Sequence, residues 1–233
     1  MSSSLHNSKK RLRAILTHVP LRMRASRATG RTSIVTIDGF TLKVPEGVFH
    51  PQFFYSSRIL IEELRRIDLT GTQVLDMGTG SGILALAAAR RGATVLAVDV
   101  NPAAAKAASA NAEANGLAGR VSVRTSDLFA RVGDEKFDVI VWNPPFYPKP
   151  PLHPARAAWD AGDSYEVIRR FAASAASHLH RGGKCILIFS SDMDIPMIIG
   201  MFTLHGFRTS TLNTYRRFLE SFEVHSFSLR ESS

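Results

Sequence analysis

The sequence feature that most restricts the fold of this chain is a glycine-rich turn between a strand pattern and a helix pattern. Residues 74–83 read VLDMGTGSGI, with apolar residues on both sides of the turn. Glycines at such a junction permit a tight turn and let a ligand approach the backbone closely. A strand, a loop of this kind and a helix together predict a nucleoside-binding α/β domain.

Strand and helix patterns alternate along most of the chain. A type I′ hairpin is expected over 33–44, because Asp38-Gly39 separates two alternating apolar stretches. Apolar strands that alternate with helices predict a mostly parallel sheet covered on both faces, and 233 residues suit one domain. The expected strands are 73–77, 93–100, 121–125, 137–142, 184–190, 208–212 and 222–229, and the expected helices are 57–67, 83–91, 165–180, 196–205 and one that begins at Asn101-Pro102 and ends at Gly116.

The positive charge of the chain is concentrated at its beginning. The formal net charge is +9, yet no acidic residue occurs before Asp38. The first 37 residues hold eight basic side chains, which leaves 21 basic and 20 acidic residues for the remainder. We therefore expect a basic N-terminal arm over 1–31 and a nearly neutral domain over 32–233. Three interpretations of the arm remain open: a segment that faces nucleic acid or the ribosome, a cleaved targeting segment, and an amphipathic helix over 12–19 packed on the domain.

Composition excludes several classes of protein. One cysteine cannot form an internal disulfide or a cysteine-based zinc site, and His178 and His180 are spaced poorly for chelation. The apolar run over 83–89 is too short to cross a bilayer. We expect a cytoplasmic protein without a metal site or a membrane contact.

The glycine turn suits a ligand that carries positive charge. The dinucleotide pattern G-x-G-x-x-G would need a glycine at Ile83, and the phosphate-binding pattern would need a lysine after Gly82. An acidic residue before a turn without cations fits the sulfonium and ammonium groups of S-adenosylmethionine, whose carboxylate can face the helix N-terminus. Asp99 ends the next strand, where a carboxylate can accept both ribose hydroxyls. Asp127 can accept from the adenine amino group, and the full set of expected cofactor contacts is Asp76, Gly78, Thr79, Gly80, Gly82, Asp99, Val100, Asp127, Leu128 and Asn143.

A second motif indicates the chemistry. The predicted strand 137–142 ends in Asn143-Pro144-Pro145-Phe146, at the sheet edge where open α/β sheets bind their ligands. The Asn143 side-chain oxygen and the Pro144 carbonyl can accept the two N–H bonds of an amide or an aromatic amine, and Phe146 can stack on the planar group. Such a nitrogen is a poor nucleophile because its lone pair is delocalised, so orienting it towards a methyl donor is the main task. The expected catalytic residues are Asn143, Pro144, Pro145 and Phe146.

Together these motifs resemble the class I S-adenosylmethionine-dependent methyltransferases that methylate nitrogen. Within them, the chain is most similar to the HemK-like glutamine methyltransferases of translation release factors, over about 44–229. The stretches that support this resemblance are 99–102, 143–151, 158–162 and 166–171. The resemblance implies a Rossmann-like, doubly wound seven-stranded sheet whose last strand is antiparallel, preceded here by a helix or hairpin extension. It also implies a protein substrate, with a release factor as the leading example, and a small zinc-ribbon activator subunit in the eukaryotic branch.

Two departures keep the substrate open. Phe146 stands where the family usually has tyrosine, and 51–57 lacks the family's acidic residue after a proline. The leading hypothesis is an N-methyltransferase for a protein glutamine side chain. The alternatives are an RNA or DNA base N-methyltransferase acting on adenine N6 or guanine N2, a small-molecule N-methyltransferase, and a catalytically silent S-adenosylmethionine-binding subunit.

Overall fold

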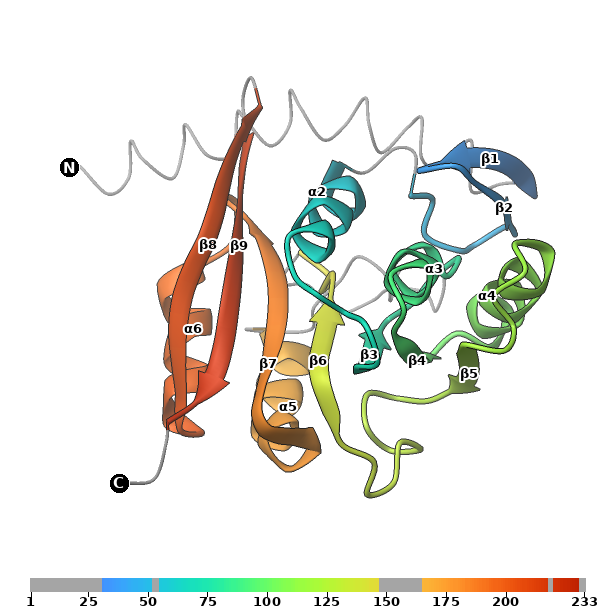
Figure 1. The fold of residues 1–233 in the computed structure, drawn as a ribbon. Helices are drawn as coiled ribbons and strands as arrows, with labels where there is room; N and C mark the ends of the chain where they lie inside the picture. The colour runs from blue at the N-terminus through green and yellow to red at the C-terminus, as the bar shows by residue number, and fades with distance from the viewer. Residues whose placement is uncertain (1–30, 52–54, 147–164, 218–219, 231–233) are drawn as a thin grey trace.

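A computed structural model describes residues 31–51, 55–146, 165–217 and 220–230 of the chain (Figure 1). The expected arm over 1–31, apart from Arg31, lies outside these residues, and so does its expected helix over 12–19. The stretches 147–151 and 158–162, which contribute to the family resemblance, also lie outside them.

The expected hairpin forms the first described element. Strands β1 (Ser33–Ile37) and β2 (Phe40–Val44) pair antiparallel around Asp38 and Gly39. Both turn residues have positive φ, 55° and 77°, which is the conformation that a type I′ turn requires and that an Asp-Gly pair tolerates. The hairpin is therefore confirmed, together with its turn.

The central sheet confirms the expected topology. Its seven strands follow the order β5-β4-β3-β6-β7-β9-β8, and β9 pairs antiparallel with both of its neighbours while the other pairings among β3 to β7 are parallel. The strands are β3 (Gln73–Met77), β4 (Thr94–Asp99), β5 (Val121–Thr125), β6 (Phe137–Trp142), β7 (Leu179–Ser190), β8 (Phe207–Arg217) and β9 (Glu220–Leu229).

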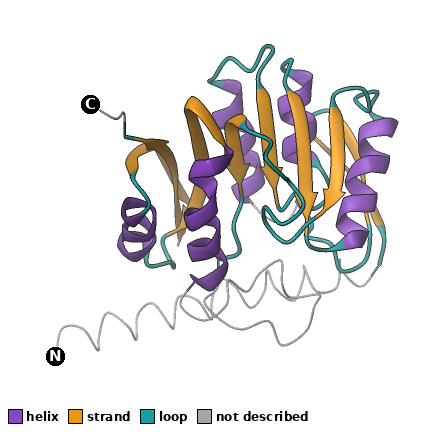
Figure 2. Cartoon of the chain, turned by 90° about the horizontal axis from the view of Figure 1, so that it is seen from below, coloured by secondary structure: helices purple, strands orange, loops and turns teal. Residues whose placement is uncertain are grey.

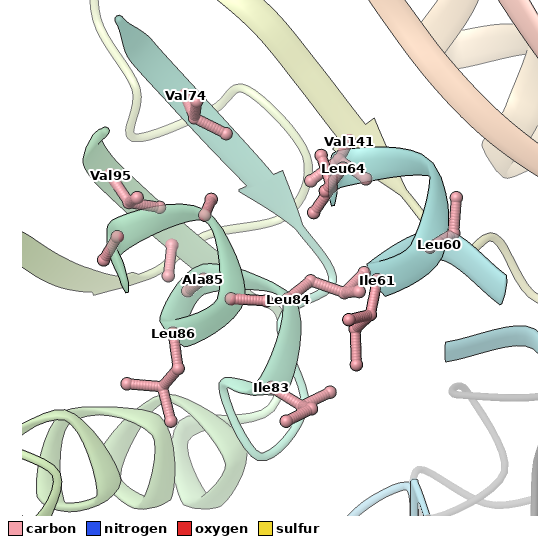
Figure 3. Close-up of a cluster of buried hydrophobic side chains, with 14 of the residues drawn as sticks. Leu60, Ile61, Leu64, Val74, Ile83, Leu84, Ala85, Leu86, Val95 and Val141 are labelled. Atoms are coloured by element: carbon pink, nitrogen blue, oxygen red, sulfur yellow. The ribbon is translucent and has the colours of Figure 1, made fainter. Parts of the chain in front are cut away.

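Helices cover both faces of this sheet (Figure 2). Alternate strand residues point to opposite faces, so Val74 and Val139 join one buried cluster while Leu75 and Ile140 join the other. The first cluster packs under α2 (Tyr55–Arg65), α3 (Ile83–Arg90) and α4 (Pro102–Ala114), and Figure 3 shows part of it. The second packs under α5 (Glu166–Ala175) and α6 (Ile195–Leu204).

Local sequence signals set the two ends of α4. The Asn101 side chain accepts a hydrogen bond from the Ala103 N–H at 2.9 Å, and Pro102 occupies the first helical position of α4. Pro102 suits this position because the first N–H groups of a helix have no intrahelical partner. The predicted start of α4 is therefore confirmed, and Gly116, with φ 70°, follows its C-terminus.

Three predicted boundaries were wrong by about five residues each. The helix expected over 165–180 ends at Ala175, a short 3₁₀ turn follows (Ala176–His178), and β7 begins at Leu179 instead of residue 184. Leu179 pairs with Phe137, and the register then shifts before Lys184 pairs with Val139. Sequence patterns missed this early start because the irregular stretch contains two glycines. Strand β8 also continues beyond the expected 208–212 to residue 217, since its polar second half pairs with β9.

Candidate active site

The glycine turn lies at the carboxyl edge of the sheet, between the ends of β3 and β4. The Thr79 N–H donates to the Val98 carbonyl at 2.9 Å, and the Gly82 N–H donates to the Thr79 carbonyl at 2.9 Å. Gly78, Gly80 and Gly82 all have positive φ. A Cβ on Gly82 would lie 3.2 Å from Ala108 of α4, so this position also needs the small residue to let the helix approach.

Asp76 is fully buried at the base of the turn. Its Oδ2 accepts hydrogen bonds from the Thr79 hydroxyl at 2.6 Å and from the Ala85 N–H at 3.0 Å. Its Oδ1 is buried and has no hydrogen-bond partner among the described residues. Burial raises the pKa of Asp76 to about 7, and the nearby Asp99 adds to this increase. Oδ2 of Asp76 therefore stabilises the turn, while Oδ1 receives no hydrogen bond from the described residues.

Asp99 fixes the turn from the neighbouring strand. Its Oδ2 accepts from the Gly80 N–H at 2.8 Å and its Oδ1 accepts from the Asn101 N–H at 2.8 Å. Burial raises the pKa of Asp99, and the two backbone donors oppose this shift by stabilising the ionised form. The next residue, Val100, is 55% exposed although it directly follows a buried strand. An exposed apolar side chain beside a carboxylate suits a nucleoside, with its base on Val100 and its ribose on Asp99.

Asp127, the expected acceptor for the adenine amino group, already forms an ion pair at this edge. Its Oδ2 accepts from Arg170 Nη2 of α5 at 2.7 Å, and both side chains are half exposed. Leu128, which follows it, is partly buried and has φ 49°. The predicted bond from an adenine amino group to Asp127 stays a prediction, and it would have to form beside this ion pair.

Asn143 begins the second motif at the end of β6. Its Nδ2 donates to the Ser56 hydroxyl of α2 at 3.1 Å, while its Oδ1 is buried and has no hydrogen-bond partner among the described residues. Pro144 is buried and Pro145 is partly buried. Phe146 packs against both hydrophobic clusters, with its ring centroid 6.2 Å from that of Phe222. The second motif thus presents an acceptor oxygen to which none of the described residues donates.

Two residues that sequence patterns did not identify also belong to this region. Ser81 is buried within the glycine turn, and its hydroxyl has no hydrogen-bond partner among the described residues. Asn111 of α4 donates to the Ser81 carbonyl at 2.8 Å and bonds the backbone N–H and C=O of Lys43 in β2 at 2.8 and 3.0 Å. A polar residue in the middle of an alanine-rich helix was the available signal for Asn111, and nothing local distinguished Ser81.

The strand order explains why these residues meet. The neighbouring strands β5, β4, β3 and β6 end at one edge of the sheet, and these ends carry Asp127, Asp99, the glycine turn and Asn143 in that order. This is the edge at which open α/β sheets bind ligands. Fold and site together define a class I methyltransferase that uses S-adenosylmethionine.

The chain belongs to the methyltransferase small domain family, whose model matches residues 39–213. A relative from Methanocaldococcus jannaschii, named as a protein N5-glutamine methyltransferase, is 35% identical over 164 residues, which cover 68% of this chain and 80% of the relative. A release factor glutamine methyltransferase from Geobacter sulfurreducens is 32% identical over 181 residues, covering 72% of this chain and 62% of its own length. The solved T. thermophilus 16S rRNA N2 G1207 methyltransferase, in complex with AdoMet and guanosine, superimposes with a TM-score of 0.67 at 27% identity, covering 86% of this chain and 50% of that one.

The residues present fit the cofactor of this family. Three buried polar atoms of the two motifs have no partner in the described ranges: Asp76 Oδ1, Ser81 Oγ and Asn143 Oδ1. They offer acceptors and a hydroxyl to a polar, positively charged ligand. Within the described ranges, no cluster of three or more His, Cys, Asp or Glu residues could hold a metal ion, and no helix is long and apolar enough to cross a membrane. Cys185 is buried in the second cluster, and burial raises the pKa of its thiol.

Proposed function

We propose that this enzyme methylates the side-chain amide of a protein glutamine, with a translation release factor as the leading substrate. The observation that carries the proposal is the Asn143 oxygen, which is buried at the end of β6 and receives no hydrogen bond from the part of the chain that the structure describes. A buried acceptor without a partner costs free energy, so a ligand N–H that pairs with it gains affinity and a defined orientation. The two relatives named as glutamine methyltransferases support this choice of nitrogen.

The residues of the second motif would act by positioning. Asn143 Oδ1 would accept one N–H of the substrate amide, and the Pro144 carbonyl would accept the other. These two bonds hold the amide plane, so that the nitrogen lone pair points at the methyl group that S-adenosylmethionine supplies. Phe146 would pack on the amide plane and exclude water. In this arrangement the gain comes from orientation and from fixed acceptors, without a strong base.

The glycine turn would hold the cofactor through separate contacts. Asp99 would accept from the ribose hydroxyls and Val100 would pack on the base. Asp76 Oδ1 would face the positive groups, and Ser81 Oγ offers a further polar contact. These assignments extend the sequence-based set by Ser81. A cofactor-binding measurement on Ser81→Ala would test the addition.

A base N-methyltransferase acting on RNA is the second candidate. It is favoured by Phe146, which replaces the tyrosine usual in release factor enzymes, and by the likeness to a structure that contains guanosine. The planar amide of glutamine and the exocyclic amine of guanine present the same pair of N–H donors to Asn143 and Pro144. The second motif alone therefore does not separate the two substrates.

The deciding experiment supplies methyl-labelled S-adenosylmethionine with either purified release factor or total RNA. We expect label in the release factor with the wild-type enzyme and none with Asn143→Ala. Labelling should be unchanged with Ser122→Ala, which removes a hydroxyl near the start of β5 that donates to the Val95 carbonyl at 3.4 Å. Label in RNA but not in protein would overturn the proposal in favour of the second candidate. Label only in a small-molecule extract, or no label despite intact cofactor binding, would support the two remaining alternatives.

The arm and the partner subunit need tests of their own. We propose that residues 1–31 form a basic arm separate from the domain over 32–233, which works in the cytoplasm where release factors act. Deleting 1–31 should weaken substrate binding most at low salt if the arm contacts phosphates. A lower melting temperature with unchanged affinity would instead show that the arm packs on the domain.

The small activator subunit stays a prediction, and co-purification with the enzyme would test it.

A further inference from the structure

Ser56 of α2 makes the polar contact by which the Asn143 side chain is held in this structure. The two residues are 87 positions apart in the chain, and Ser56 is only 1% exposed. The Asn143 Nδ2 donates to the Ser56 hydroxyl at 3.1 Å. Because Ser56 lies in the first turn of α2 and Asn143 follows β6, the contact joins two elements that are distant in the sequence.

An asparagine amide can present either end to a substrate. With the nitrogen at Ser56, the oxygen points away from the hydroxyl and is buried without a partner among the described residues. After a rotation of 180° about the last side-chain bond, the nitrogen would take the place of that oxygen. The Asn143 NH2 group, which is a donor, would then face the substrate N–H, which is also a donor, and the contact would be repulsive.

Buried amide nitrogens are rarely left without an acceptor, whereas carbonyl oxygens with an unused lone pair are tolerated more often. The orientation with Nδ2 on Ser56 is therefore preferred before a substrate arrives. The hydroxyl of Ser56 gives the nitrogen its acceptor, and the oxygen that remains is the group that the substrate needs.

We infer that Ser56 is a positioning residue, which fixes the Asn143 amide with its oxygen toward the substrate nitrogen. The inference rests on the proposed role of Asn143. It adds a residue from outside both sequence motifs, contributed by the helix that precedes the glycine turn. Ser56 touches neither the substrate nor the cofactor in this assignment and acts only through Asn143.

The test compares three substitutions at this position. Ser56→Ala removes the acceptor, Ser56→Cys keeps a similar size but offers only a weak acceptor, and Ser56→Thr keeps the hydroxyl. We expect kcat to fall about tenfold in the Ala and Cys variants, with the affinity for S-adenosylmethionine unchanged, because tenfold corresponds to about 1.4 kcal/mol, within the range for one lost partner. Ser56→Thr should retain most of the wild-type rate, and Ser122→Ala serves as the control.

A second readout does not depend on the substrate. The side-chain N–H signals of Asn143 can be identified by NMR as those missing from Asn143→Ala. We expect one of them to exchange slowly with solvent in the wild type and in Ser56→Thr, and at least about tenfold faster in Ser56→Ala. This measurement remains informative if no release factor is labelled, so failure of the proposed function and failure of this inference are distinguishable.

Two results would overturn the inference. One is unchanged exchange of the Asn143 amide in Ser56→Ala. The other is a loss of cofactor affinity and melting temperature in parallel with kcat in the Ala and Cys variants, which would show that Ser56 supports the fold in general. A fall in kcat with cofactor affinity retained, restored by threonine, supports positioning.

Discussion

Asp76 makes the stability of the protein depend on pH in a way that one substitution can isolate. The carboxyl group is fully buried, and Oδ2 accepts two hydrogen bonds while Oδ1 accepts none from the described residues. Burial is the largest cause that raises its pKa from 3.8 to about 7. In the unfolded chain the group ionises near its ordinary value, so the folded state binds an extra proton between about pH 4 and pH 7.

This extra proton determines whether stability rises or falls with pH. Since the folded state holds more protons than the unfolded state in this range, the free energy of unfolding decreases as the pH rises. A pKa of about 7 instead of 3.8 corresponds to a total loss of about 4 kcal/mol, complete above pH 7. More than half of this loss, about 2–3 kcal/mol, falls between pH 5 and pH 8.

Asp76→Asn removes the ionisation and keeps the shape. Its side-chain oxygen can accept from Thr79 and Ala85 as Oδ2 does. Urea unfolding of both proteins without cofactor at pH 5 and pH 8 should show the variant gaining about 2–3 kcal/mol of stability relative to wild type at the higher pH. Taking this difference removes the contributions of groups common to both proteins, and Asp134→Asn, at an exposed position, provides the control. An equal stability difference at the two pH values would refute the reasoning.

Three further predictions concern the same edge of the sheet. Asn111→Ala leaves three backbone groups without their hydrogen-bond partner, so the free energy of unfolding should fall by about 2–4 kcal/mol in urea titrations. Calorimetry should also show weaker cofactor binding by this variant. Gly82→Ala places a methyl group 3.2 Å from Ala108 at a φ of +90°, and a loss of at least about 1 kcal/mol in the same titration is expected, whereas Gly119→Ala, with open space around it, should change little. Arg170→Ala breaks a half-exposed ion pair, so stability should change by less than about 1 kcal/mol, while cofactor affinity rises if Asp127 is then available to the adenine amino group.

Sequence signals predicted the parts of this molecule that local rules determine. The Asp-Gly turn, the Asn101 cap and the alternation of strands and helices each act within a few residues, and they gave the hairpin, the start of α4 and the parallel sheet. The expected position of Asn143 at the end of a strand was also correct, because strand ends follow from the apolar pattern.

Such local rules could not predict contacts between segments that are distant in the sequence. Ser56 meets Asn143 only because α2 packs over the sheet, and no pattern near either residue reports that packing. The ion pair of Arg170 with Asp127 joins α5 to the turn after β5 for the same reason. The early start of β7 was missed because Gly182 and Gly183 interrupt the apolar pattern. The structure places Gly183 so tightly that a Cβ would lie 2.8 Å from the Phe137 carbonyl.

The outer edge of β2 has a consequence for how the molecule unfolds and associates. Asn111 and Asn115, one helical turn apart, bond the backbone N–H and C=O groups of Lys43 and Thr41, which are two residues apart on the strand. The two amides take the place that a third strand would occupy, so this edge offers no template for strand addition by another chain. An isolated two-stranded hairpin is marginally stable in water, and here its outer amides are tied to side chains of α4. The hairpin and α4 should therefore open as one cooperative unit, and slow exchange of the Thr41 and Lys43 amides would report the integrity of a helix to which neither residue belongs.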